Sequence, residues 1–394
     1  MTTTPQEGGE AKRPFLIIPL LVSGNFLSVL TGYIVIGFLP TLQQAFGLSA
    51  AEAGFVVAAF SATYAISSPL MALIGGYLGY PLSLSLAMAT CGMGALVAAF
   101  SSTIDGVIVG RVLSAFGSSL YSPAAAALAV NIAGIAQRGR ALSYIYLGIS
   151  LSQVLGIPAG ALLASELGWP AAFLGVAGMT LLVAPVLFAV IPRKHRPVPI
   201  GLSRYGLALR SAAVRNALLL TAIISLPSNG VYAFLASIFG SRAGASEETL
   251  ALLLSAVGVG VLVGTIFVGR ALDRIGALKT LVIVLVATAA ILAPITYLSY
   301  DFPVAIGVAT LLGAALFTYP PALQHRLSEL APEAASVLFP LNASMLYVGA
   351  ALGPLAAGYV IDNLGLQWLG PITAIMCLAI CAQLCGCIRA NRLA

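Results

Sequence analysis

Apolar stretches of about 20 or more residues alternate along the chain with short segments rich in charged and turn-forming residues. A helix needs about 20 residues to cross a bilayer, whereas strands of a membrane barrel alternate apolar and polar side chains over about ten. The pattern therefore predicts transmembrane helices. Twelve spans are expected near residues 15–39, 50–73, 80–100, 105–131, 139–163, 170–191, 215–239, 249–269, 278–299, 302–324, 334–361 and 368–388.

Composition excludes a soluble protein of this length. Apolar residues make up 60% of the 394 residues and charged residues only 8%, against roughly 25% charged in soluble proteins. The 41 glycines would let helices approach closely, which favours a packed all-α integral membrane protein. The net charge of +6 does not indicate a nucleic-acid partner, because the basic residues lie in short loops between apolar runs.

The distribution of basic residues predicts orientation. If the N-terminus lies in the cytoplasm, 16 of the 18 Lys and Arg residues fall on cytoplasmic segments, Arg242 falls in an outer loop and Arg111 within a span. Basic residues mark the cytoplasmic side of membrane proteins. We therefore expect a multi-pass protein of the cell (inner) membrane with both termini cytoplasmic.

One long hydrophilic segment, residues 192–214, separates the sixth predicted span from the seventh. Its position suggests an N-terminal bundle of six helices over residues 1–191, a cytoplasmic linker, and a C-terminal bundle of six over 215–394. Landmarks recur between the two parts at offsets of 196 to 197 residues: Pro123 and Pro320, Pro158 and Pro354, Gly168 and Gly365. Such a duplication predicts two pseudo-symmetric bundles around a central cavity.

The loop after the eighth span, GRALDRIGALK, runs from Gly269 to Lys279. It resembles the G-x-x-x-D-R-x-G loop of the major facilitator superfamily, and the whole chain is similar to the twelve-helix drug and metabolite (sugar efflux-like) proton antiporters of that family. The resemblance implies a conformational latch formed by Gly269, Asp273, Arg274 and Gly276. The alternative is a charged loop that only sets topology. The matching loop of the first half has Gly79 and Tyr80 where the family carries Asp and Arg.

Two spans resemble the glycine–proline motif of the family's antiporters. Glycine allows close helix approach and proline bends a helix, so these residues are interpreted as hinge and packing elements. They are Gly148, Gly156, Pro158 and Gly160 in the fifth span and Gly353 and Pro354 in the eleventh.

Arg111 is the one formal charge placed inside a predicted span. An intramembrane Arg costs at least about 2.5 kcal/mol, so it normally faces a cavity or a partner. The segment from Gly110 to Gly117 also resembles the family's R-x-x-x-G region. We expect Arg111 to contact substrate; the alternatives are that it snorkels outward or pairs with Asp105.

Polar side chains deep in the spans are the candidate cavity lining, although hydrogen bonds between helices would explain them equally. They are Asn25, Arg111, Tyr121, Tyr146, Gln153, Asn229, Tyr232, Tyr319, Asn342 and Tyr347. None of the 12 carboxylates falls in the middle of a span. This disfavours a cationic drug and favours a neutral or anionic metabolite, such as a sugar.

The sequence therefore predicts a secondary active transporter that exports a small polar metabolite or drug by alternating access. The alternative is a facilitative carrier or importer of a small organic solute without proton coupling. Neither histidine lies in an H-E-x-x-H context and no Ser, His and Asp residues share one depth, which argues against an enzyme. We expect no cofactor, no metal site and a monomer in the lipid bilayer, with protons as a candidate coupling ion.

Overall fold

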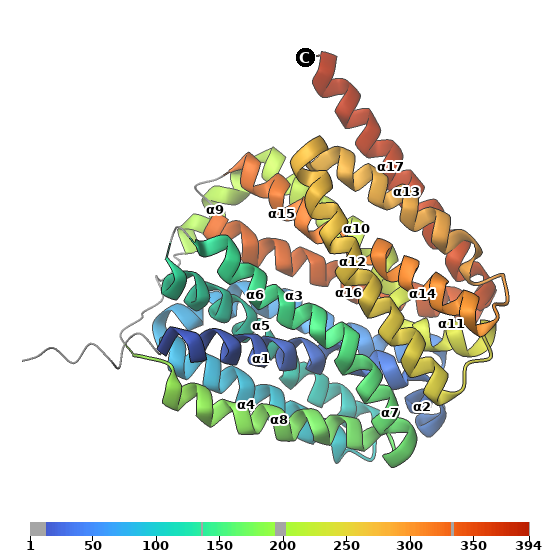
Figure 1. Ribbon diagram of the computed structural model, residues 1–394, viewed down its shortest axis with the longest axis horizontal. Helices are drawn as coiled ribbons and strands as arrows, with labels where there is room; N and C mark the ends of the chain where they lie inside the picture. The colour runs from blue at the N-terminus through green and yellow to red at the C-terminus, as the bar shows by residue number, and fades with distance from the viewer. Residues whose placement is uncertain (1–12, 135–136, 194–201, 332–334, 394) are drawn as a thin grey trace, which may run out of the picture.

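The computed structural model describes residues 13–134, 137–193, 202–331 and 335–393. Within these ranges every regular element is a helix (Figure 1). Eleven helical stretches of the described chain are long and apolar enough to cross a membrane, and one pair of helices bent by 49° makes a twelfth. The all-α membrane fold with twelve spans predicted from the sequence is thus confirmed.

The six spans of the N-terminal half begin at Arg13 and end at Val190. They are formed by α1–η1–α2 (Arg13–Tyr33, Ile34–Phe38, Leu39–Phe46), α3 (Ala50–Leu78), α4 (Tyr80–Ala99), α5 (Ile104–Ala133), α6–η3–α7 (Arg138–Leu151, Ser152–Gly156, Ile157–Leu167) and α8 (Trp169–Val190).

The six spans of the C-terminal half begin at Ala212. They are formed by α10–α11 (Ala212–Ala233, Leu235–Arg242), α12 (Glu247–Ile275), α13 (Ala277–Ile295), α14–α15 (Phe302–Leu316, Tyr319–Leu330), α16 (Ala335–Leu364) and η5–α17 (Leu366–Trp368, Leu369–Leu393).

Several spans that the sequence predicts as single helices are interrupted. The fifth contains a π-helical turn, η3, directly before Pro158. The seventh bends by 49° at Phe234, and the tenth breaks before Pro320. Proline lacks a backbone N–H and cannot complete the helical ladder, which explains the interruptions at Pro158 and Pro320.

The segment predicted as a hydrophilic linker contains a short helix, α9 (Leu202–Arg210). Tyr205 of α9 is buried against Val214 and Leu218 of α10 and against residues of α15 and α16. Arg215 donates hydrogen bonds to the carbonyls of Leu209 (3.0 Å) and Arg210 (2.8 Å), and so caps the C-terminus of α9. The linker end therefore carries an ordered helix, and the bundle boundaries at 191 and 215 stay a prediction.

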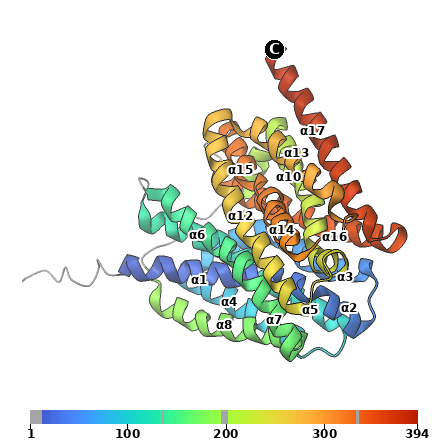
Figure 2. The same cartoon turned by 45° about the vertical axis from the view of Figure 1, so that its right-hand side comes forward.

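The two halves touch mainly through α3 against α16 and α7 against α12. Figures 1 and 2 show their helices converging near α2, α7 and α11 and diverging toward α9 and the C-terminus. We call the converging end the sealed end and the end that carries α9 the linker end. Because the number of spans is even, α1 begins and α17 ends on the linker side.

Candidate functional site

The N-terminus of α3 is held at the sealed end by a residue of the other half. An α-helix leaves its first four N–H groups without intrahelical partners. A capping box satisfies two of them, since Ser49 N–H donates to Glu52 (2.8 Å) and Glu52 N–H donates to Ser49 Oγ (3.2 Å). The Asp362 carboxylate, at the end of α16, accepts the other two from Ala50 (2.9 Å) and Ala51 (2.8 Å). One carboxylate thus joins the two halves.

Glycines let α3 and α16 approach closely beside that carboxylate. A Cβ atom on Gly358 would lie 2.5 Å from the carbonyl oxygen of Ala50, and a Cβ on Gly54 would collide with the carbonyl of Pro354. Both contacts involve main-chain atoms, which cannot move aside without shifting a helix. The sealed end is therefore closed both by close packing of the α3 and α16 backbones and by the hydrogen bonds that the Asp362 carboxylate accepts.

A chamber lies between the halves on the linker side of this seal. Its walls come from α1, η1 and α3 of one half and from α10 and α16 of the other. They are Gly32, Tyr33, Ile36, Val57, Phe60, Ser61, Asn229, Tyr232, Tyr347, Ala350 and Pro354. Its volume is about 10 Å³, close to the smallest space that holds one water molecule. In this conformation the chamber is collapsed, and a solute could enter only if its walls moved apart.

Four aromatic residues line the chamber: Tyr33, Phe60, Tyr232 and Tyr347. Tyr64 and Tyr347, from opposite halves, stack with centroids 3.7 Å apart, and Tyr33 meets Tyr232 edge-on at 5.8 Å, again across the halves. Tyr232 also contacts Phe317 at 4.6 Å. Tyrosines that meet across a closing interface provide apolar faces together with hydroxyl groups, a combination suited to polar organic solutes.

The Arg111 side chain is buried behind this wall. The side chain is 1% exposed and donates hydrogen bonds to the carbonyls of Thr31 (2.8 Å), Gly32 (2.8 Å) and Val56 (3.4 Å). Its guanidinium carbon lies 4.8 Å from the centre of the Phe60 ring. Its partners are main-chain carbonyls of α1 and α3, so pairing with Asp105 and snorkelling are both wrong. Direct contact with substrate stays a prediction.

Three of the predicted cavity residues form hydrogen bonds between helices. Asn25 donates to the carbonyl of Ile145 (2.9 Å) and accepts from Ser122 (2.7 Å). Asn342 accepts from Thr221 (2.7 Å). Tyr121 donates to a main-chain carbonyl of α1, that of Leu21, at 3.3 Å, and is fully buried. The structure places these side chains in helix packing, the alternative that the sequence left open.

Two other predicted residues are buried with a free polar atom. Gln153, in the π-helical turn, is 5% exposed, and its Oε1 finds no hydrogen-bond donor in the described part of the chain. Tyr319 is 1% exposed, and its hydroxyl has no partner there either. Tyr319 opens α15 two residues after Phe317, whose ring contacts the chamber wall. Unsatisfied buried polar atoms and π-turns both occur preferentially at functional sites.

Polar contacts also cross between the halves toward the linker end. Gln324 of α15 donates to the Tyr146 hydroxyl at 3.0 Å, and Ser344 of α16 donates to the carbonyl of Ala65 on α3. Tyr146 is 44% exposed, so it lies outside the closed chamber. Asn229, by contrast, lies in the chamber wall and donates to Ser225 within its own helix (2.9 Å).

Comparison with known proteins agrees with this architecture. Residues 21–338 and 217–389 match the family model described as Major Facilitator Superfamily. The chain belongs to the major facilitator superfamily. This MFS protein is therefore a multi-pass membrane protein of a transporter family, and the expectation that it is a carrier and not an enzyme is confirmed.

Two curated relatives of this MFS protein span nearly its full length. It is 25% identical over 364 residues to the uncharacterized MFS-type transporter YbcL of Bacillus subtilis (92% of this chain, 93% of the relative). It is 25% identical over 360 residues to the inner membrane transport protein YdhP of Escherichia coli K12 (90% and 92%).

Solved structures of a bacterial homolog to the human lysosomal transporter Spinster share its fold. Those of the inward-facing unoccupied and occupied conformations match with TM-scores of 0.76 and 0.77, at 15% and 16% identity. The matches cover 96% and 97% of this chain, and 97% and 98% of the homolog. At this identity the likeness establishes the fold alone.

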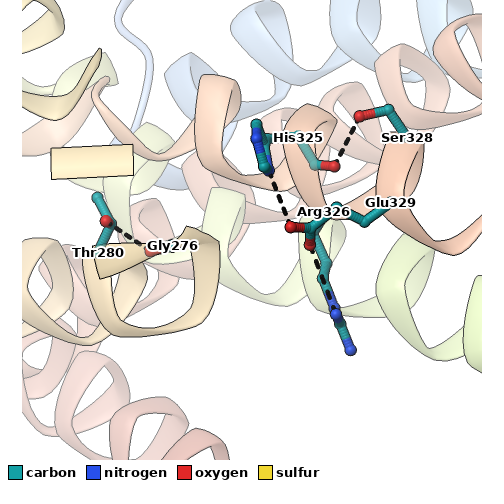
Figure 3. A network of polar contacts seen from close by, with 6 residues as sticks. All are labelled: Gly276, Thr280, His325, Arg326, Ser328 and Glu329. Atoms are coloured by element: carbon teal, nitrogen blue, oxygen red, sulfur yellow. Dashed lines mark hydrogen bonds and ion pairs between the residues drawn. The ribbon is translucent and has the colours of Figure 1, made fainter. Parts of the chain in front are cut away.

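The MFS loop motif lies at the linker end, between α12 and α13. Gly276 has φ +78°, and Thr280 donates to its carbonyl at 2.8 Å (Figure 3). Asp273 and Arg274 are exposed, and neither makes a hydrogen bond or ion pair with the described residues. A Cβ atom on Gly269 would meet nothing within 4 Å, so no helix packs closely on this glycine in this conformation. The latch role stays a prediction.

A small charged cluster on α15 lies near that loop. His325 and Arg326 approach the Glu329 carboxylate at 3.4 and 3.6 Å, and Ser328 donates to the His325 carbonyl at 2.7 Å (Figure 3). The His325 and Glu329 side chains are each 45% exposed. Exposed pairs of this kind contribute little to stability.

The predicted hinge glycines are packing positions in this structure. A Cβ atom on Gly148, Gly156 or Gly160 would collide with α1 or η1 of the same half. Gly353 packs against the carbonyl of Leu226, while Pro354 lines the chamber. These residues set how closely helices lie on either side of the chamber, and whether they bend during transport stays a prediction.

The sequence reasoning missed several chamber residues. Tyr33, Phe60 and Ser61 lie on α1 and α3, yet aromatic and small residues in apolar spans look the same whether they face lipid or a cavity. The signal that was available is a Tyr in the middle of each of two spans, with a hydroxyl that hydrocarbon would leave unpaired.

Proposed function

We propose that this protein is a secondary active transporter that exports a small polar organic solute across the cell inner membrane by alternating access. The observation that carries the proposal is the chamber between the two halves, lined by polar aromatic side chains from both and closed at one end by α3 and α16. A chamber built by two halves opens to the other side when the halves rock about it.

The orientation belongs to the same proposal. Basic residues concentrate on the segments at the linker end, which is the pattern of a cytoplasmic face. With that end in the cytoplasm, both termini are cytoplasmic and the seal described here closes the outer side. The unpartnered Asp273 is consistent with this, because a latch on the cytoplasmic side would be released while that side opens.

We propose proton antiport as the coupling mode and a monomer as the working unit, in line with the drug and metabolite antiporters that the sequence resembles. One observation favours a second candidate, a facilitative carrier or importer without proton coupling. The described spans place no carboxylate in the chamber wall, so a proton carrier of the usual kind is missing from it.

Purified protein in liposomes tests both candidates. Vesicles loaded with a pool of labelled sugars, aromatic acids and amino acids are given an inward proton gradient, and solute loss is measured together with internal pH. Saturable solute loss that accelerates with the gradient and acidifies the lumen supports the antiporter. Saturable loss that is unaffected by the gradient supports the facilitative carrier, and the absence of saturable loss contradicts the transporter role.

A further inference from the structure

The chamber of this protein lies beside a positive charge that has no counter-ion. Three main-chain carbonyls accept hydrogen bonds from Arg111, but no carboxylate pairs with it in the described part of the chain. The ion pairs found in those residues belong to the exposed cluster on α15. Carbonyl dipoles solvate a guanidinium without cancelling its charge, so a net positive charge is buried here.

This charge lies directly behind the chamber wall. Gly32, whose carbonyl accepts from Arg111 at 2.8 Å, is a wall residue, and so is Phe60, whose ring centre is 4.8 Å from the guanidinium carbon. Tyr347, on the opposite wall, meets the same Phe60 ring with ring centroids 6.4 Å apart. Three of the five guanidinium N–H groups are used in the carbonyl bonds, which leaves two without an acceptor in the described residues.

The rest of the wall fixes the shape that would fit. The rings of Tyr33, Phe60, Tyr232 and Tyr347 line the chamber, and the Tyr347 ring is itself stacked almost parallel, at 18°, on Tyr64. Ser61 and Asn229 add a hydroxyl and an amide group to the same wall. Such a wall accepts a flat apolar body that carries a few polar groups.

We infer that the chamber selects small planar organic anions, of which aromatic carboxylates are the simplest class, and that Arg111 attracts them through the wall formed by Gly32 and Phe60. The inference rests on the proposed transport function and names its substrate class. A cation would meet the like charge of Arg111 and no wall carboxylate. A neutral solute would leave that charge uncompensated. An anion gains from the charge in a medium where electrostatic interactions are screened less than in water.

Three probes of nearly equal size test the selection: 4-hydroxybenzoate, 4-hydroxybenzamide and 4-hydroxybenzylamine, which carry a negative, zero and positive charge at neutral pH. Binding to the full-length protein in nanodiscs is measured by titration calorimetry. We expect the benzoate to bind at least about tenfold more tightly than the amide, and the amine to show no saturable binding. Equal affinity for all three, tighter binding of the amine, or no saturable binding of the benzoate overturns the inference.

A charge reversal in the wall gives an independent test that leaves Arg111 in place. Ser61 lines the chamber, so Ser61→Asp adds a carboxylate to the chamber wall, and Ser61→Asn adds similar bulk without charge. We expect the Asp variant to lose the preference for the benzoate and to bind the amine, whereas the Asn variant keeps the wild-type order. An unchanged order in a folded Asp variant overturns the inference.

The outcomes separate this inference from the proposed function. If liposomes show saturable transport of a neutral or cationic solute and the benzoate does not bind, the protein is a transporter and the anion selection is wrong. If no solute in the pool is transported but the benzoate binds in the expected order, the selection holds and the transport proposal fails.

Discussion

Removing the carboxylate of Asp362 should weaken the seal between the two halves. This side chain accepts hydrogen bonds from Ala50 and Ala51 at the start of α3, and these are two of the four N–H groups that the helix cannot satisfy itself. Asp362→Asn keeps the shape and one acceptor oxygen but loses the charge and turns an NH₂ group toward the second N–H. Asp362→Ala removes both bonds.

The expected loss of stability of the sealed state follows from the kind of hydrogen bond that is lost. Hydrogen bonds to charged groups contribute about 1.5–3 kcal/mol, and a carboxylate at an exposed helix N-terminus contributes about 0.3–1 kcal/mol. Asp362 is exposed, so the lower part of these ranges applies. We expect the Asn variant to lose about 1–2 kcal/mol from the sealed state, which corresponds to roughly a 5–30-fold rise in the population with an open seal.

Hydrogen–deuterium exchange of the folded protein measures this population directly. If exchange requires opening of the seal, protection of the amides over residues 50–54 should fall by the same factor of roughly 5–30, and further in the Ala variant. Protection of α4 and α8, which lie within one half, should stay unchanged. Glu166→Gln is the matched control, because it removes an exposed carboxylate at the same end, and it should change protection by no more than about twofold.

Two results would refute this reasoning. Unchanged protection at residues 50–54 in a folded Asp362→Asn protein would mean that the carboxylate does not hold the seal. An equal loss of protection in α4 and α8 would mean that Asp362 supports the whole fold and has no specific role at the sealed end.

Three further predictions concern other parts of the molecule. Gly358→Ala should lower hydrogen-exchange protection at the seal and reduce the stability of the protein by about 1–3 kcal/mol, because its Cβ would lie 2.5 Å from the Ala50 carbonyl oxygen. Gly386→Ala is the control: its Cβ would have no neighbour within 4 Å, so thermal unfolding should stay unchanged. Arg111→Lys should reach the membrane normally yet transport poorly, because an ammonium lacks the planar guanidinium group that donates to the carbonyls of Thr31 and Gly32 at the end of α1. Transport near the wild-type rate at equal expression would contradict this prediction. A Cys introduced at Leu207, 68% exposed on α9, should react with an impermeant maleimide only after permeabilisation, and labelling of intact cells would reverse the proposed orientation.

The spans were predictable because their signal is local. A run of apolar residues long enough to cross a bilayer is visible in any single stretch of sequence, and the helices follow those runs closely. The interruptions within the spans were harder to predict from the sequence. Pro158 and Pro320 indicate bends, but the π-helical turn before Pro158 depends on how α1 and α12 pack around it. The break at Phe234 has no proline next to it.

The site was only partly predictable because its contacts join distant residues. Asp362 is recognisable as a carboxylate near the end of a span, yet its partners lie 312 and 311 positions away and are main-chain N–H groups that every residue possesses. Arg111 presents the same difficulty, since its acceptors are carbonyls 80 and 79 positions distant. Asn25 and Asn342 look like cavity residues in the sequence, and only the fold reveals that helix contacts use their amides.

In the mechanism that we propose, different charges serve gating and substrate recognition. Negative charges of the described chain lie at the ends of the bundle, with Asp362 bound at the sealed end and Asp273 unpartnered at the linker end, as expected if only one end closes at a time. Beside the chamber lies a positive charge, Arg111. Loss of Asp362 should therefore change how often the seal opens without changing the order in which the chamber binds the three probes. The charge added by Ser61→Asp should change that order and leave the seal intact. If the Asp362 carboxylate and the charge at residue 61 act independently, the effects of the double variant on seal opening should add; non-additive effects would mean that the seal senses the charge in the chamber.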